Sequence, residues 1–119
     1  MRVAYIAHPM SGDVKGNLVL IALIGRQINL EEPDVIPFAQ YFFDCHSLVD
    51  SVERERERGI RNGIALLKKG FIDELRLYGN RVSAGMMFEV DLALGLGIEV
   101  KPMTEATARW LQQRWPHTL

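Results

Sequence analysis

The sequence predicts one three-layer α/β/α domain, in which helices cover both faces of a mainly parallel sheet of four to five strands. Short β-prone runs alternate with longer segments of helical period along the whole chain. Apolar residues make up 48% and charged residues 24%, which is typical of a globular protein. A length of 119 residues suits a single domain with a real core. We therefore expect residues 1–119 to fold as one unit with right-handed crossovers.

The first two predicted elements are a buried strand and a long helix. The β-prone run at residues 3–7 ends at His8-Pro9. Asp13 can cap a helix over residues 14–30, which Pro33-Asp34 stops. Apolar residues cover more than one face of this helix, so we expect it to be heavily buried against the sheet or a partner.

The middle of the chain is harder to assign. Val35-Ile36 predicts a second strand, which Pro37 cuts short. Residues 38–45 are rich in aromatic side chains and predict an irregular segment. Residues 48–69 have a helical pattern that opens with alternating charges and becomes apolar, and Gly70 ends it.

The last third of the chain predicts two more strands and two more helices. Residues 74–78 alternate between polar and apolar, which indicates a strand with one semi-polar face that ends at Gly79-Asn80. A helix over residues 84–96 and a strand over residues 98–102 follow. Thr104 can then cap a final helix that contains two large apolar side chains, Trp110 and Leu111.

Composition excludes several classes of function. The single cysteine, Cys45, allows no intrachain disulfide, and Cys45-His46 lacks the further ligands of a zinc site, so we expect no metal and no cofactor. The net charge of -1 lacks the basic excess of a protein that binds a nucleic-acid polymer. No run approaches the roughly 20 apolar residues of a membrane span, and no signal segment is present. We therefore expect a cytoplasmic protein without membrane association.

Ligands of parallel sheets bind beyond the carboxyl ends of the strands, where the strand order reverses. The loops at residues 7–13 and 79–85 qualify. The first loop leads into a helix N-terminus, where free N–H groups favour an anion such as phosphate, although a tight turn with a helix cap explains it equally well. The candidate binding residues of this loop are His8, Pro9, Met10, Ser11 and Gly12.

Glu89 is the candidate for catalysis. It lies early in the helix that follows the second loop, among apolar neighbours at helical spacing, and a carboxylate on such a face is costly without a purpose. The nearby helix N-terminus should help to keep it ionised, which suits a nucleophile. The alternative is a structural glutamate that caps a neighbouring element or pairs with an arginine such as Arg58 or Arg61.

These residues resemble the nucleoside 2-deoxyribosyltransferase-like proteins, which include the transferases and the 2'-deoxynucleoside 5'-monophosphate N-hydrolases. The resemblance spans most of the chain and implies a flavodoxin-like fold that cleaves N-glycosidic bonds. It rests on Tyr5-x-x-x-Pro9-x-Ser11-Gly12, Asp73-Glu74-Leu75, and Ser83-x-Gly85-x-x-x-Glu89 followed by Ala93 and Gly97-Ile98.

The resemblance also implies roles for single residues. Glu89 matches the family's catalytic glutamate, which attacks the anomeric carbon of the deoxyribose, and Tyr5 matches the tyrosine that holds this carboxylate. Ser83 stands where the nucleotide hydrolases have a serine that contacts the 5'-phosphate, so that branch is the closer match. Gly85 and Met86 complete the expected substrate site. The family implies a homodimer or a larger homo-oligomer, with a nucleoside or nucleotide as the small-molecule partner.

One departure from the family concerns the departing base. Family members carry an aspartate in the helix before the third strand that assists protonation of the base, whereas the corresponding stretch here, residues 61–64, contains no acid. Catalysis could then be slow or absent. The chain also resembles related phage or bacterial proteins of unknown ligand in Glu55, Arg56 and the segment around Pro37. The alternatives are therefore a non-catalytic nucleotide-binding protein or a structural protein with a vestigial pocket.

Aromatic side chains near the predicted second strand admit two interpretations. They can form a stacking wall for a nucleobase, or they can pack in the core or a dimer contact, which is about twice as common for any one such residue. The residues are Phe38, Tyr41, Phe42 and Phe43.

Overall fold

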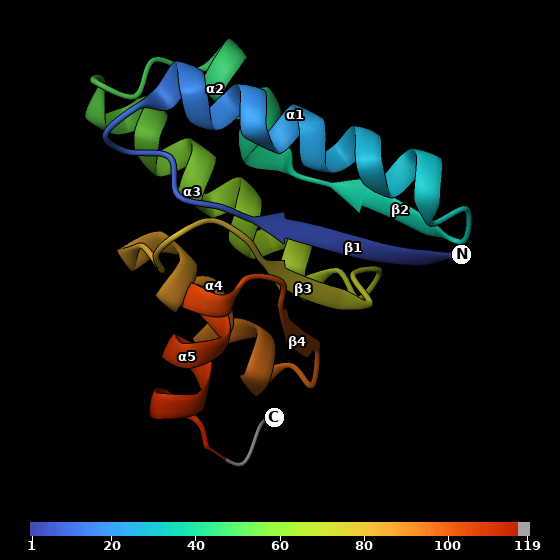
Figure 1. Cartoon of the computed structure of the whole chain (residues 1–119). Coiled ribbons are helices and arrows are strands. Elements are labelled where there is room, and N and C mark those ends of the chain that lie inside the picture. Colours follow the sequence, from blue (N-terminus) through green and yellow to red (C-terminus); the bar gives the residue numbers. More distant parts are fainter. Residues whose placement is uncertain (117–119) are drawn as a thin grey trace.

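A computed structural model describes residues 1–116 and confirms the predicted α/β fold (Figure 1). Its sheet has four strands, all parallel, in the order β2-β1-β3-β4. The arrangement is that of a flavodoxin-like three-layer domain. The strands are β1 (Arg2–Ala7), β2 (Val35–Phe38), β3 (Glu74–Leu77) and β4 (Glu99–Pro102).

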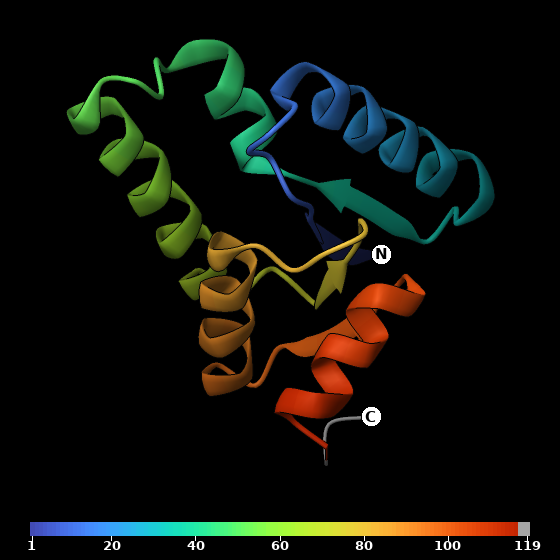
Figure 2. The same ribbon diagram turned by 60° about the vertical axis from the view of Figure 1, so that its left-hand side comes forward.

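Helices cover both faces of the sheet. Figure 2 shows α1 and α5 on one side and α3 and α4 on the other. The strand order reverses at β1, because the chain passes from β1 to β2 in one direction and then crosses to β3 in the other. The ends of β1 and β3 therefore meet, with Ala7 paired with Leu77. The helices are α1 (Val14–Glu31), α2 (Gln40–Ser47), α3 (Glu53–Lys68), α4 (Ala84–Gly95) and α5 (Glu105–Arg114).

Predicted side-chain caps fix where α1 and α5 begin. Asp13 Oδ1 accepts a hydrogen bond from the Gly16 amide of α1 at 3.0 Å. Thr104 Oγ1 accepts one from the Thr107 amide of α5 at 3.2 Å. Both caps confirm the sequence prediction, and each satisfies an amide that the helix itself leaves without a partner.

The structure corrects the assignment of the middle of the chain. Residues 40–47, predicted to be irregular, form α2, and the next helix begins at Glu53 rather than at residue 48. The Glu55 carboxylate accepts a hydrogen bond from the Val49 amide at 3.0 Å, which holds the connection between α2 and α3 outside both helices. Strand β2 continues through Pro37 to Phe38, because β2 is an edge strand and needs no N–H on its outer side.

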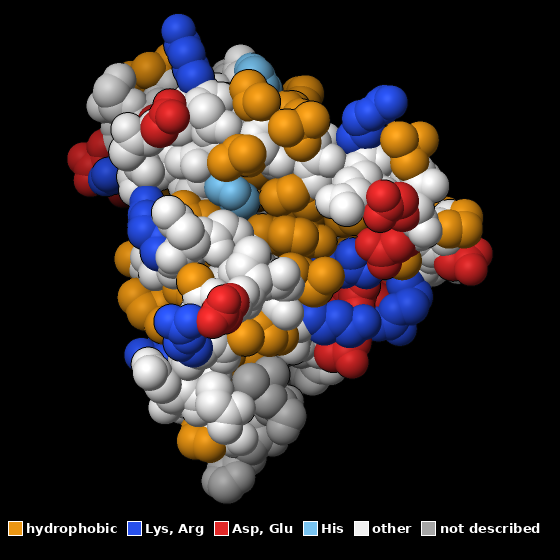
Figure 3. Space-filling view, viewed as in Figure 1, with side chains coloured by type: hydrophobic (Ala, Val, Ile, Leu, Met, Phe, Trp, Pro, Cys, Tyr) orange, Lys and Arg blue, Asp and Glu red, His pale blue; other side chains and the backbone are white. Residues whose placement is uncertain are grey.

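Helix α1 is less buried than its sequence predicts. Of its apolar side chains only Ile21 and Ile28 are buried, whereas Val19, Leu20 and Leu23 are 60%, 49% and 55% exposed. Figure 3 shows hydrophobic side chains at the surface over this helix. The sheet therefore covers one face of α1 and leaves a second apolar face uncovered within the chain.

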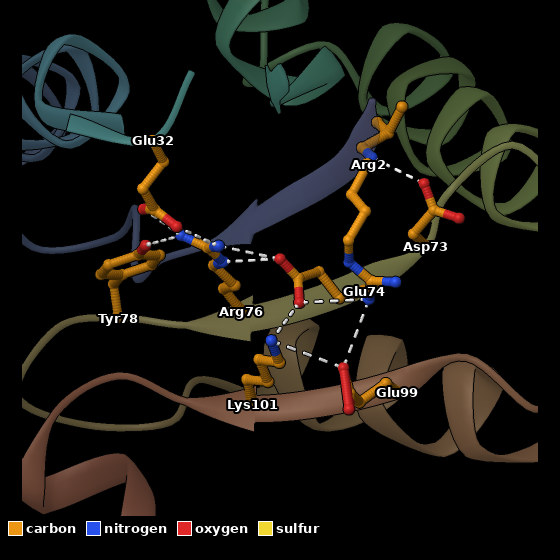
Figure 4. Close-up of polar contacts among 9 residues, drawn as sticks. Arg2, Glu32, Asp73, Glu74, Arg76, Tyr78, Glu99 and Lys101 are labelled. Carbon is orange, nitrogen blue, oxygen red and sulfur yellow. Dashed lines mark hydrogen bonds and ion pairs between the residues drawn. The ribbon is translucent and has the colours of Figure 1, made fainter. Parts of the chain in front are cut away.

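The predicted semi-polar face of β3 is buried, and its charged side chains form an ion-pair network. Arg76 is 4% exposed and pairs with Glu74 and with Glu32, the residue that follows α1, each at 2.8 Å (Figure 4). Lys101 of β4 binds Glu74 at 2.7 Å, and Arg2 approaches it at 3.5 Å. Burial alone would raise the pKa of Glu74, but hydrogen bonds from Lys101 and Arg76 lower it below its usual value.

The main hydrophobic cluster joins side chains of three strands and three helices. Trp110 and Trp115 pack against it, with ring centroids 5.5 Å apart. No helix among residues 1–116 is long and apolar enough to cross a membrane. The buried members of the cluster are Tyr5, Ala7, Leu67, Ile72, Leu75, Leu77, Met86, Val90, Ala93, Val100 and Leu111.

Candidate functional site

The structure brings Tyr5 and Glu89 together near the reversal of strand order. Tyr5 lies on β1 and is 2% exposed, and its side chain belongs to the hydrophobic cluster. Glu89 lies on the second turn of α4 and is partly exposed. The Tyr5 hydroxyl and the Glu89 carboxylate lie near enough for each to shift the pKa of the other. The two residues predicted to act together therefore share one site.

Burial gives Glu89 an unusual pKa. Removal of the carboxylate from water raises its pKa to about 7, and the nearby Tyr5 hydroxyl opposes this rise. Burial and the nearby Glu89 carboxylate together raise the pKa of Tyr5 well above its usual value. We expected the N-terminus of α4 to keep Glu89 ionised. Burial outweighs that effect, because the influence of a helix end fades within its first turn.

The structure does not support the structural alternative for Glu89. The ion pairs found among residues 1–116 do not include Glu89. Arg58, one of the arginines considered as a partner, donates its Nε hydrogen to Asn62 Oδ1 at 3.1 Å on the exposed side of α3. Glu89 is thus a carboxylate without an ion-pair partner among the described residues, and its pKa of about 7 lets it gain or lose a proton near neutral pH.

The two predicted ligand loops press against each other. Gly79 has a φ of +91°, and a Cβ atom there would lie 2.6 Å from Pro9 Cδ. Only glycine fits such a close approach. His8 is buried, and its Nδ1 bonds to the Pro9 carbonyl at 2.7 Å, so the imidazole shapes this loop. Met10 contributes its carbonyl, which accepts a hydrogen bond from Asn17 Nδ2 at 3.1 Å.

The rim of the site carries small polar residues and one arginine. Ser11 and Gly12 are exposed, and Gly12 has a φ of +98°. Arg81, within the other loop, donates from Nη2 to the Ser11 carbonyl at 3.0 Å and to Ser11 Oγ at 3.2 Å. Sequence reasoning missed Arg81, although its place in a ligand loop was a usable signal. The arrangement puts a guanidinium beside the N-terminus of α1.

Ser83, Gly85 and Met86 lie where α4 begins, with different surroundings. Ser83 Oγ accepts a hydrogen bond from the Met86 amide at 3.2 Å and so caps the helix, while its own O–H remains able to donate. Gly85 is exposed, and a Cβ there would lie 4.0 Å from Ser83 Oγ. The Met86 side chain is 1% exposed and packs in the hydrophobic cluster, which indicates a structural role for it.

An acidic residue, Asp44, lies beside residues 61–64, the stretch that contains no acid in its own sequence. Asn62 Nδ2 donates to Asp44 Oδ1 at 3.4 Å, and Asp44 is 9% exposed. Asp44 belongs to α2, the helix that the sequence pattern did not predict. Sequence reasoning missed this aspartate because it looked for an acid within α3 itself.

The aromatic residues near β2 separate into three groups. Phe38 and Tyr41 pack around Tyr5, with ring centroids 6.3 and 6.2 Å from it. Phe43 is 65% exposed. Phe42 lines a hollow of about 490 Å³ between α1, β2 and α2, whose lining includes neither Tyr5 nor Glu89. Packing therefore accounts for Phe38 and for the Tyr41 ring.

The comparisons with known proteins place the site within one family. The family model described as "Domain of unknown function (DUF7768)" matches residues 2–103, a range that contains all four strands and both ligand loops. No curated protein and no solved structure matches the chain.

Proposed function

The chain belongs to the DUF7768 family, and on that premise we propose that it cleaves the N-glycosidic bond of 2'-deoxynucleosides or their 5'-monophosphates. The observation that carries this proposal is the proximity of the Tyr5 hydroxyl and the Glu89 carboxylate where the strand order reverses. The resemblance to nucleoside 2-deoxyribosyltransferase-like proteins gives the same two residues the same roles. Glu89 acts as the nucleophile and Tyr5 orients it.

The chemistry follows from the charge that develops on the sugar. A Glu89 oxygen attacks C1', the C1'–N bond breaks, and its electron pair leaves with the base, which then takes up a proton. Water attacks C1' of the resulting ester and releases the sugar, or a second base does so in a transfer reaction. Attack requires the ionised carboxylate. A pKa of about 7 leaves a substantial ionised fraction of Glu89 near neutral pH.

The rim of the site supports recognition of a 5'-phosphate. Ser11, Gly12 and the N-terminus of α1 offer hydrogen-bond donors, and Arg81 adds a positive charge beside them. The free O–H of Ser83 adds a donor at the start of α4. Binding energy from the phosphate would hold the sugar over Glu89, which is how remote contacts accelerate a reaction at another atom. A monophosphate is therefore the preferred substrate.

The test is to incubate the protein with each deoxynucleoside monophosphate and to measure free base by chromatography, with Glu89→Gln alongside. The native protein should release base and Glu89→Gln should release far less. Equal release by both proteins would end the catalytic proposal. Saturable binding without release, weakened by Ser11→Ala or Ser83→Ala, would instead identify a non-catalytic nucleotide-binding protein.

The proposal also includes self-association of the chain and a cytoplasmic location. The exposed apolar face of α1 supports self-association into a homodimer or larger oligomer. The free, exposed thiol of Cys45 fits the reducing cytoplasm, where nucleotides are metabolised.

A further inference from the structure

Two buried polar atoms have no hydrogen-bond partner in the described part of the chain, Tyr41 Oη and Asp44 Oδ2. Native proteins pair nearly all such atoms, so each exception calls for an explanation. Both belong to α2 and stand three residues apart, which puts them on one face of that helix. The face therefore presents one hydroxyl donor and one carboxylate acceptor, both unused.

Other contacts fix the orientation of Asp44. Its Oδ1 accepts hydrogen bonds from Gln40 at 3.3 Å and from Asn62 at 3.4 Å. Two glycines one turn apart on α3, Gly59 and Gly63, face Asp44 and Tyr5. A Cβ at Gly59 would lie 3.7 Å from Asp44 Oδ2, and a Cβ at Gly63 would lie 3.8 Å from the Tyr5 hydroxyl. Asp44 and Tyr5 therefore adjoin the same strip of α3.

Tyr41 connects this face of α2 to the catalytic pair. Its ring lies 6.2 Å from that of Tyr5. Burial, and then the charge of the Glu89 carboxylate, raise the pKa of Tyr41 well above its usual value. Helix α2 thus brings its unused donor and acceptor to the site that holds Tyr5 and Glu89.

We infer that Tyr41 and Asp44 form a subsite for the base of the bound nucleotide, where the Tyr41 hydroxyl donates to a base acceptor and Asp44 Oδ2 accepts from a base N–H. Nucleobase edges carry such donors and acceptors side by side. This inference rests on the proposed function. Both atoms are covered in the structure, so a base reaches them when α2 moves. The helix has only 8 residues, and no side chain caps its start at Ala39.

The first test uses Tyr41→Phe, which removes only the unpaired hydroxyl. In a Glu89→Gln background, where substrate is not consumed, calorimetry should show affinity for deoxynucleoside monophosphates falling about 5- to 10-fold, the effect of one lost hydrogen bond. Affinity for 2-deoxyribose 5-phosphate, which has no base, should not change. Tyr78→Phe is the matched control, because Tyr78 contacts Arg76 in the ion-pair network.

A structural role predicts a different result. If Tyr41→Phe weakened both ligands equally, or left nucleotide affinity unchanged, the subsite would be refuted. Urea unfolding supplies a second readout: loss of an unpaired buried hydroxyl should leave stability unchanged or raised. Base release by the native protein without any Tyr41 dependence of binding would refute the subsite alone. Absence of nucleotide binding in every variant would refute the proposed function as well.

Discussion

Replacing Glu89 with glutamine should stabilise the protein at alkaline pH and have little effect at acidic pH. The pKa of Glu89 rises from an ordinary 4.5 to about 7 in the folded protein. A raised pKa in the folded state gives stability that is complete below the unfolded pKa and is lost as pH rises through the folded pKa. A change of one pH unit in the pKa corresponds to about 1.4 kcal/mol of stability. Because the side chain is partly exposed, solvent screens part of this effect, and we expect about 2 to 3 kcal/mol.

The assay is urea unfolding of the native protein and of Glu89→Gln at about pH 5 and about pH 8. Most of the expected change in stability falls between these two pH values. Glu89→Gln should raise the free energy of unfolding by about 2 to 3 kcal/mol at the higher pH and by less than about 1 kcal/mol at the lower. Glu57→Gln, at an exposed position on α3, is the control and should be neutral at both. An equal effect of Glu89→Gln at the two pH values would refute the reasoning.

Three further outcomes follow from the structure. Tyr5→Phe removes the hydroxyl that lowers the pKa of Glu89, so the pH at which base release reaches half its maximum should move upward. An unmoved pH profile would contradict the pairing. Gly79→Ala places a Cβ 2.6 Å from the Pro9 ring at a φ of +91°, and it should lower the free energy of unfolding by at least about 1 to 2 kcal/mol. The control is Gly25→Ala, whose Cβ meets no atom within 4 Å and which should raise the free energy of unfolding slightly. Glu74→Gln should lower the free energy of urea unfolding by about 3 kcal/mol, because it removes a charge partner of the buried Arg76. A neutral result would mean that water replaces the carboxylate.

Local patterns predicted most of the fold. Asp13 and Thr104 are helix caps whose partners lie within one turn, so the sequence alone identifies them. Gly79 marks the end of a strand for a similar reason: its positive φ is a local requirement. Helix caps and turn glycines depend on residues that are adjacent in the chain, so they can be predicted from the sequence alone.

The errors involve contacts between distant parts of the chain. Helix α2 is held by the packing of Tyr41 on Tyr5, which no local period reveals. The burial of Arg76 depends on Glu32, which is 44 residues away. Asp44 meets Asn62 only because α2 and α3 lie together. The same holds for the pKa of Glu89, since burial can be known only from the fold.

Both outer strands of the sheet contain a proline, Pro37 in β2 and Pro102 in β4. A proline cannot donate the backbone hydrogen bond by which a strand from another molecule would be added, and Lys101 places a charge on the second border as well. Neither border is suited to continuing the sheet from one molecule into the next. Self-association would then use the outer surfaces of helices, where it does not extend a sheet from one molecule to the next.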